Sequence, residues 1–310
     1  MTVDRDRVTA NGLEFEYLRQ GGGDRLALCL HGFPDDAGTM RPLLDRLAGA
    51  GFTAVAPYMR GYGPTDAAPD GDYTMGAVAG DAIALADELG DGEVVLVGHD
   101  WGAAAGYAAG AIAPETFSHL VTLAVPPNFV DSAVDSPLQW LRSWYHFFFQ
   151  LPALPERALR AREFALVEFL WRTWSPSWDY PEERLAEVTD TFSQPGTVEA
   201  ALAYYRQFGS QVAHKLLDDA LDRQLPDPTS ADSSSESGED ASDGSGGIDV
   251  PALVVAGEED GCIGAELFEG ADEAFAGRCR CITVRNAGHF VHRERPDVVA
   301  DEILQFTGEP

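Results

Sequence analysis

Residues 94–109 read VVLVGHDWGAAAGYAA and contain three features in order. The apolar run at the start predicts a buried strand, and the small residues at the end favour a helix. Between them, Gly98 and Gly102 allow a tight turn that exposes the middle residue, Asp100, where the helix begins. Aspartate is also a common helix N-cap, so the turn alone leaves a purely structural role open. The carboxylate of Asp100 is nevertheless the first candidate nucleophile.

Similar short apolar runs recur along the chain and alternate with helical patterns. The strand candidates are 26–30, 53–57, 94–98, 120–125, 252–257 and 281–284. The helix candidates lie near 39–49, 74–89, 101–113, 264–276 and 296–307. Continuous apolar strands separated by helices predict an α/β fold with a mostly parallel central sheet and helices on both faces. Residues 8–19 resemble an antiparallel edge hairpin.

The pattern changes in the middle of the chain. From 131 to 225 only helical signals appear, which predicts an inserted helical cap on a main domain made of 1–130 and 250–310. Insertions at the carboxyl ends of parallel strands lie where α/β sheets bind ligands. Residues 226–249 contain no basic residue and almost nothing apolar, so we expect an acidic, mobile loop there.

Composition narrows the function classes. The formal charge of −30 makes nucleic acid and anionic membranes improbable partners. Lys215 is the single lysine among 21 basic residues, a composition that resembles proteins of salt-loving microbes more than that of an ordinary acidic protein. No apolar run approaches the roughly 20 residues of a spanning helix, and the first residues do not resemble a signal peptide. We therefore expect a halophilic, cytoplasmic protein with reduced cysteines.

The type of nucleophile restricts the reaction. A serine that attacked a saturated carbon would leave an ether, which the same machinery could not cleave. An aspartate that attacks this carbon leaves an ester, which water hydrolyses at the carbonyl. Asp100 therefore indicates substrates attacked at saturated carbon, such as epoxides or alkyl halides.

Ester hydrolysis needs a base and a group that orients it. His289, after the last strand candidate, and Asp260, after the strand candidate at 252–257, are the predicted pair. His292 is a rival base that we interpret as a surface or capping histidine. Glu258 and Glu259 are rival orienting groups, which leaves the choice of Asp260 open at this point.

The hydrolytic step also needs backbone N–H groups that stabilise an oxyanion. The amides of Phe33, in the HGFPD segment (31–35), and of Trp101, directly after Asp100, are the expected donors. Trp101, His31 and Pro34 are expected beside the substrate, although stabilisation of a turn is the simpler role for His31.

Four segments together resemble the epoxide hydrolase branch of the α/β-hydrolases. They are HGFPD (31–35), RGYGPTD (60–66), GHDWG (98–102) and AGHFVHRERPDVV (287–299). In that branch two cap tyrosines protonate the epoxide oxygen, and the resemblance assigns this role to Tyr145 and Tyr205. Tyr204 stands where the branch usually has tryptophan. Packing of the cap is the alternative role for both tyrosines.

The resemblance implies an α/β-hydrolase that opens epoxides to vicinal diols, with a small hydrophobic substrate, water, and no cofactor or metal. A haloalkane dehalogenase is the first alternative. It would hold halide with Trp101 and a second donor, which Phe33 cannot supply. The possible substitutes are Trp140, Trp144, Trp171, Trp174 and Trp178. A fluoroacetate dehalogenase fits less well, because Trp101 stands where that group has arginine. A non-catalytic binding protein of the same fold is the last alternative.

Overall fold

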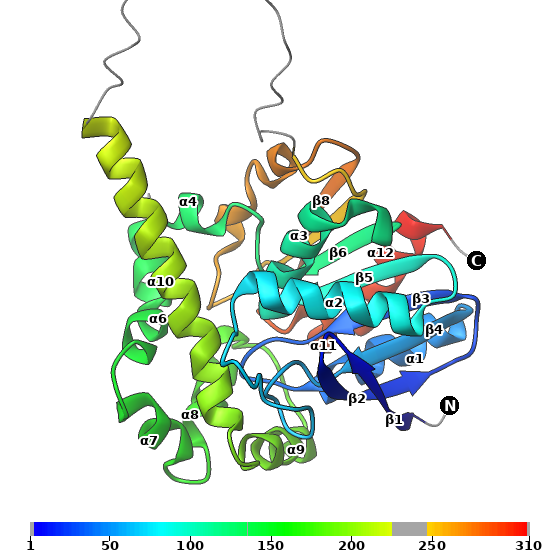
Figure 1. Ribbon diagram of the computed structural model, residues 1–310, viewed down its shortest axis with the longest axis horizontal. Coiled ribbons are helices and arrows are strands. Elements are labelled where there is room, and N and C mark those ends of the chain that lie inside the picture. Colours follow the sequence, from blue (N-terminus) through cyan, green and yellow to red (C-terminus); the bar gives the residue numbers. More distant parts are fainter. Residues whose placement is uncertain (1–2, 135, 225–246, 309–310) are drawn as a thin grey trace, which may run out of the picture.

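The computed structural model describes residues 3–134, 136–224 and 247–308. Its centre is an eight-stranded sheet in the order β1-β2-β4-β3-β5-β6-β7-β8 (Figure 1). The strands are β1 (Asp4–Ala10), β2 (Leu13–Gln20), β3 (Arg25–Leu30), β4 (Phe52–Pro57), β5 (Val94–His99), β6 (His119–Leu123), β7 (Ala252–Gly257) and β8 (Cys279–Val284). The β1–β2 hairpin and the β2–β4 pair are antiparallel, and all other pairs are parallel.

Helices cover both faces of the sheet, as the apolar strands require. Every residue of β4, β5 and β7 is buried, which is the state that a parallel sheet needs. Figure 1 shows α2 (Met75–Leu89) and α3 (Trp101–Ile112) on the near face. The far face carries α1 (Arg41–Gly49) and α12 (Pro296–Thr307), with the short α11 (Val291–Glu294) before it. The predicted α/β architecture is confirmed.

One predicted helix is wrong. Instead of a helix over 264–276, two short 3₁₀ helices, η3 (Ala265–Phe268) and η4 (Ala271–Ala274), occupy this segment. Gly270 lies between them with φ +74°, a left-handed conformation that ends regular helix. Two further 3₁₀ helices, η1 (Ala37–Met40) and η2 (Pro114–Thr116), precede α1 and β6.

The described part of the chain between β6 and β7 contains seven α-helices and no strand. Its helices are α4 (Phe129–Val134), α5 (Pro137–Arg142), α6 (Trp144–Phe149), α7 (Leu154–Arg160), α8 (Ala165–Trp174), α9 (Glu182–Phe192) and α10 (Thr197–Gln224). Figure 1 shows them grouped beside the sheet, with α10 as the long outer helix. Residues 225–246, which include most of the acidic segment predicted to be mobile, fall outside the described residues. After it, Ile248 pairs with Phe275 in a parallel bridge.

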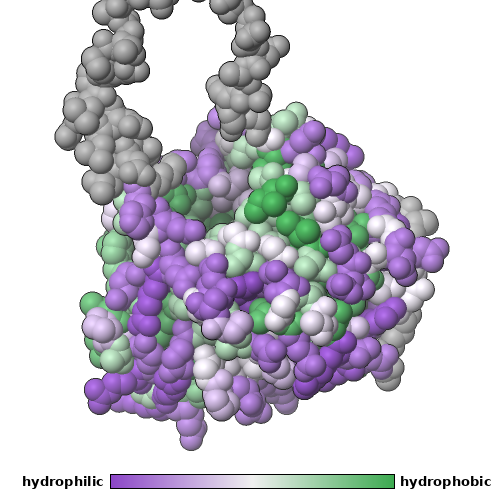
Figure 2. Space-filling model, viewed as in Figure 1, coloured by the Kyte–Doolittle hydropathy of each residue, from purple (hydrophilic) through white to green (hydrophobic). Residues whose placement is uncertain are grey.

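The parallel strands all end at the edge of the sheet that faces these inserted helices, and the loops after β3, β5, β7 and β8 meet there. Hydrophilic residues cover much of the face in Figure 2, and apolar side chains gather in a recess between α10 and the sheet domain. In the described ranges, no helix is both long enough and apolar enough to cross a bilayer.

Candidate active site

Asp100 occupies the turn between β5 and α3 in a backbone conformation that few side chains adopt. Its φ is +53° and its ψ is −114°, a strain worth about 1–3 kcal/mol. Glycines make this turn possible, since a Cβ at Gly98 would collide with the Gly102 carbonyl and a Cβ at Gly102 with the Leu30 carbonyl. A Cβ at Gly32 would collide with the Asp100 side chain. The local sequence therefore forces this carboxylate out of the sheet edge.

The two carboxylate oxygens of Asp100 have different surroundings. Oδ1 accepts a hydrogen bond from the backbone N–H of Phe33 at 2.7 Å. Oδ2 lies 3.7 Å from Nε2 of His289, beyond hydrogen-bond distance. One oxygen is thus held by the chain, whereas the other remains available for attack.

His289 is fully buried and is fixed by Asp260. Its Nδ1 lies 2.9 Å from Oδ2 of Asp260, which leaves Nε2 directed toward Asp100. The other oxygen of Asp260 accepts the backbone N–H groups of Cys262 at 2.7 Å and Ile263 at 2.9 Å. The structure therefore brings together Asp100, His289 and Asp260, the three residues that the sequence predicts as nucleophile, base and orienting acid.

The rival residues lie elsewhere. Glu258 and Glu259 are exposed, whereas Asp260 is 4% exposed. His292 is not the surface or capping histidine that the sequence suggested. It is completely buried, and its Nε2 lies 2.9 Å from the Thr39 hydroxyl, so it joins α11 to η1 in the interior.

The environment sets the charge on these groups. Burial alone would lower the pKa of His289, but Cys262, Asp260 and Asp100 outweigh it and raise this pKa well above its ordinary value. Burial raises the pKa of Cys262 to about 11, so its thiol is uncharged at neutral pH and the two carboxylates hold the proton on the ring. Burial would raise the pKa of Asp100, but His289 and the Phe33 amide lower it. The resting pair is a carboxylate beside an imidazolium.

Tyr145 from α6 and Tyr205 from α10 both reach this site. Their ring centroids are 5.7 Å apart and perpendicular. The Tyr145 hydroxyl lies 3.1 Å from Sγ of Cys262, whereas the buried Tyr205 hydroxyl has no hydrogen-bond partner among the described residues. Burial raises the pKa of both phenols well above the usual value, so both keep their protons at neutral pH. The indole N–H of Trp101, whose ring centre is 4.8 Å from that of Tyr205, is not hydrogen-bonded to a described residue either, but it lies close enough to the Tyr205 hydroxyl to oppose the rise in the pKa of that phenol.

These side chains border a cavity of about 430 Å³ at the carboxyl edge of the sheet. Asp100, Trp101, Tyr145 and Tyr205 line it together with apolar residues of α3, α4 and α10. An apolar cavity with a few convergent polar groups is typical of small-molecule sites. We call it the inner cavity.

The fold and this arrangement agree with a match to a known family. A family model described as alpha/beta hydrolase fold matches residues 28–296. The chain belongs to the α/β-hydrolase fold family. In this fold the nucleophile occupies a strand-to-helix turn, and the acid and the histidine follow it in the chain, which is the order of Asp100, Asp260 and His289 here.

Several relatives of this α/β-hydrolase are similar over almost the whole chain. Human epoxide hydrolase 4 is 27% identical over 98% of this chain and 78% of its own length. AB hydrolase superfamily protein YfhM of Bacillus subtilis is 26% identical over 96% of both chains. The crystal structure of epoxide hydrolase A from Mycobacterium thermoresistibile has a TM-score of 0.77 at 24% identity and covers 98% of both chains, which supports the shared fold.

The end of α8 fastens the two loops that carry Asp260 and His289. The Trp174 carbonyl accepts the N–H of Gly261 at 3.0 Å and that of His289 at 3.1 Å. Next to it, the Ser175 hydroxyl accepts the Phe290 N–H at 3.1 Å. We call Trp174 and Ser175 the α8 clasp. No sequence pattern indicated these contacts, because they join residues that are far apart in the chain, 115 positions for Ser175 and Phe290.

His31 and Pro34 lie away from the inner cavity, although the sequence placed both beside the substrate. His31 is fully buried, with Nδ1 3.0 Å from the Gly32 carbonyl and Nε2 accepting the Met59 N–H at 3.0 Å. The Pro34 carbonyl accepts the indole N–H of Trp171 at 2.9 Å. Both residues fix the loop that presents the Phe33 amide.

Three functional candidates escaped the sequence reasoning. His99 precedes the nucleophile, and its Nε2 lies 2.9 Å from the His289 carbonyl, with its pKa lowered to about 3 by burial. His146 lines the inner cavity beside Tyr145. Cys262 contacts Tyr145, as described above. Only His99 had a signal, which was its place inside the turn motif.

Asp260, Cys262 and His289 offer ligand atoms within 4.8 Å of one another, the spacing of a metal site. These atoms already have partners in the triad, since Asp260 accepts three hydrogen bonds and His289 shares one of them. The group is therefore explained by the geometry of the base and its orienting acid. We assign no metal to it.

Proposed function

We propose that this protein is an epoxide hydrolase that works through an ester on Asp100. One observation carries the choice of substrate. The buried Tyr205 hydroxyl, which keeps its proton and has no described partner, lines the same cavity as the carboxylate of Asp100. An acid placed opposite a nucleophile is what the opening of a strained ring needs, because the ring oxygen becomes an alkoxide as the carbon is attacked. The names of the relatives support the same substrate class.

The first step follows from the two carboxylate environments. Oδ2 of Asp100 attacks a ring carbon while Tyr205, with Tyr145 beside it, donates a hydrogen bond to the ring oxygen. The carbon–oxygen bond of the ring breaks, an ester bond forms, and the oxygen takes a proton. The loss of the Asp100 charge lowers the pKa of His289, which then releases its proton to replace the one that the tyrosine gave.

The second step regenerates the enzyme. Neutral His289, held by Asp260, takes a proton from water at Nε2, and the resulting hydroxide attacks the carbonyl carbon of the ester. Oδ1 becomes the oxyanion, and the Phe33 N–H that already contacts it at 2.7 Å stabilises the charge, with the Trp101 amide as the second expected donor. Collapse of the tetrahedral intermediate releases a vicinal diol.

Dehalogenation is the second candidate, favoured by the unpartnered indole N–H of Trp101. A halide needs another donor, and the cap tryptophans do not supply one in the inner cavity. The N–H of Trp140 donates to the Val134 carbonyl and that of Trp171 to the Pro34 carbonyl. None of the five tryptophans proposed for this role borders the inner cavity. The observations therefore favour the epoxide.

A single turnover in oxygen-labelled water tests the mechanism. Excess enzyme is mixed with styrene oxide, and the peptide that contains Asp100 is analysed by mass spectrometry. Label in that carboxylate together with diol formation supports the ester route. A labelled diol with an unlabelled peptide contradicts it. Release of halide from bromobutane without turnover of epoxides would favour the dehalogenase, and the absence of any adduct would favour a non-catalytic binding protein.

We also propose that the enzyme is halophilic and cytoplasmic, with residues 131–225 acting as a cap over the main domain. Excess carboxylates repel one another at low ionic strength, and molar salt reduces the screening length to about 3 Å. The melting temperature should therefore rise between about 0.1 M and 2 M KCl. An activity that increases when salt is removed would contradict this proposal.

A further inference from the structure

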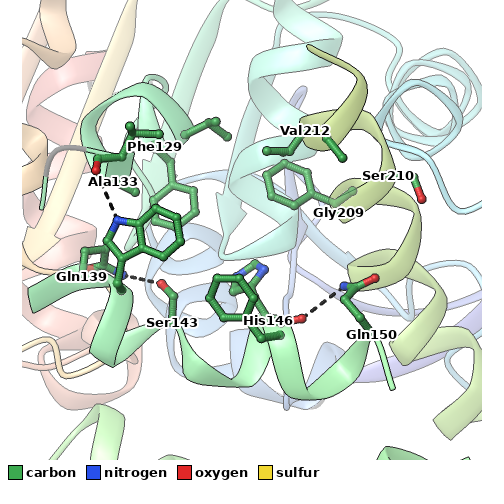
Figure 3. A pocket seen from close by; sticks show the side chains of 15 residues that line it. Phe129, Ala133, Gln139, Ser143, His146, Gln150, Gly209, Ser210 and Val212 are labelled. Atoms are coloured by element: carbon green, nitrogen blue, oxygen red, sulfur yellow. Dashed lines mark hydrogen bonds between the residues drawn. The ribbon is translucent and has the colours of Figure 1, made fainter. Parts of the chain in front are cut away.

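A second cavity lies outside the inner one, between α4, α5, α6 and α10. It has a volume of about 490 Å³, and Figure 3 shows its lining side chains. Most of the lining is apolar and comes from the aromatic and aliphatic side chains of Phe129, Val130, Val134, Trp140, Phe147, Phe208 and Val212. We call it the outer cavity.

The outer cavity adjoins the inner cavity and shares lining residues with it. Phe129, Val130, His146 and Phe208 border both spaces. His146 stands at this junction, with its ring centre 5.1 Å from that of Tyr205. Burial lowers the pKa of His146 to about 4, so the junction is uncharged at neutral pH. The four shared residues are therefore uncharged at neutral pH, whereas the exposed Asp131 on α4 lines only the inner cavity.

Several polar groups around the outer cavity already have partners within the chain. The Gln139 amide donates to the Ser143 hydroxyl and the Cys262 carbonyl and accepts the Gly264 N–H. Figure 3 shows the Gln139–Ser143 bond and the bond from Gln150 to the His146 carbonyl.

Two further polar groups of the lining are also engaged. The Ser210 hydroxyl donates to the Arg206 carbonyl, and the Trp140 indole donates to the Val134 carbonyl. Among the described residues that line the outer cavity, none is an arginine, lysine, aspartate or glutamate. A ligand in this space gains free energy from removing apolar surface from water rather than from polar contacts.

We propose that the outer cavity holds the straight alkyl chain of an uncharged epoxide whose ring lies at Asp100. This inference rests on the proposed function and names its substrate class, the epoxides of long-chain alkenes. Each methylene group moved from water into such a space contributes about 0.8 kcal/mol, which corresponds to roughly fourfold in kcat/KM. The value of kcat/KM should therefore increase with the length of the alkyl chain once the chain is longer than the inner cavity can hold.

Val212→Asp tests the proposal with two substrates, epoxyhexane and epoxydodecane. A carboxylate in the outer cavity should lower the ratio of kcat/KM for the long substrate to that for the short one by about tenfold, because the chain would then contact a hydrated charge. Val298→Asp is the matched control, since Val298 is 41% exposed on α12 and lines neither cavity. Its ratio should equal that of the wild type.

Ala213→Trp, which fills the outer cavity from α10, gives a second test that adds no charge. It is compared with Ala186→Trp on the exposed side of α9. A ratio that falls in Ala213→Trp and in Val212→Asp but in neither control supports the proposal. A ratio that is unchanged in both cavity variants, or that falls equally in the controls, overturns it.

Binding of dodecanol separates this proposal from the proposed reaction, because it needs no turnover. Calorimetry should give an affinity that Val212→Asp weakens about tenfold and Val298→Asp leaves unchanged. If Val212→Asp weakens dodecanol binding as expected but no epoxide is hydrolysed, the apolar chain site is supported and the proposed reaction is wrong. If epoxides are hydrolysed but dodecanol binds equally to both variants, the chain site is overturned.

Discussion

The turn that carries Asp100 and the helices that carry Tyr145 and Tyr205 form opposite sides of one cavity, yet different parts of the sequence determine them. The turn is local, since the glycines at 98 and 102 and the buried strand before them force the carboxylate into place. The tyrosines depend on how α6 and α10 pack against the sheet domain. Aromatic contacts such as the 4.8 Å approach of Tyr205 to Trp101 set that packing.

This difference separates the proposed nucleophile from the proposed proton donors. A nucleophile fixed by its own turn should tolerate rearrangement of the helices, whereas the tyrosines should lose their alignment when that packing changes. The effects of substitutions on the two sides of the cavity should therefore differ in size and in kind.

Asp100→Asn should abolish turnover, with a fall in kcat of at least about 10⁴-fold, because the amide cannot form the ester. Asparagine tolerates positive φ better than most residues, so the turn should keep its shape. Diol formation is measured by chromatography and folding by circular dichroism. A folded variant that retains a tenth of the activity would exclude the ester mechanism.

Tyr205→Phe should lower kcat/KM for epoxides by about 10²-fold, since the free hydroxyl is the proposed acid. Tyr145→Phe should lower kcat/KM about tenfold, a smaller effect, because the Tyr145 hydroxyl already contacts Cys262. Tyr204→Phe is the matched control, since the Tyr204 hydroxyl donates to the Arg60 carbonyl outside the inner cavity. Its activity should be normal and its stability lower by about 1 kcal/mol. Equal losses in all three variants would indicate packing roles only.

Ser175→Ala should loosen the α8 clasp. The Phe290 N–H would lose its acceptor and Glu294 would lose one donor while keeping the Gly288 N–H, which costs about 2 kcal/mol of stability. We expect a fivefold lower kcat, because the loop that carries His289 would be less well fixed. Ser193→Ala, whose hydroxyl bonds within its own helix, serves as the comparison. Equal midpoints of urea unfolding for the two variants would show that the Ser175 hydroxyl does not stabilise the fold through the α8 clasp.

The raised pKa of His289 makes stability depend on pH in a defined direction. Because the folded protein holds this proton more tightly than the unfolded chain does, the stabilisation is complete below about pH 6.5 and is lost as the pH rises through the folded pKa. Asp260→Asn removes one of the charges that raise this pKa. Between pH 6.5 and 8.5 in constant molar KCl, the free energy of unfolding should fall less in this variant than in the wild type. An equal fall in the free energy of unfolding with pH in both proteins would contradict the raised pKa of His289.

Most of the fold and the core of the site followed from the sequence. Apolar strands, helical spacing and the glycine turn are local signals, and they placed the sheet and Asp100 correctly. The break at Gly270 was missed because 264–276 has helical composition, and only the positive φ of this glycine shows where the helix stops. The predicted triad and tyrosine roles stay predictions that the geometry supports.

What the sequence did not indicate depends on contacts between distant segments. The burial of His292 comes from the packing of α11 against η1, and His31 faces the backbone rather than the substrate because of the loop that contains Met59. The partner of Tyr145 is the thiol of Cys262, two residues after Asp260, and no sequence pattern predicts this contact. Such features need the assembled fold.

The bonds from the Trp174 carbonyl to Gly261 and His289 also restrict how the protein can open. If the inserted helices swung away as a rigid lid, the imidazole would lose its anchorage each time a substrate entered. Entry and exit should instead occur by small displacements that leave the end of α8 in place. The enzyme would then exchange substrate and product while its proton-transfer machinery stays assembled throughout the cycle.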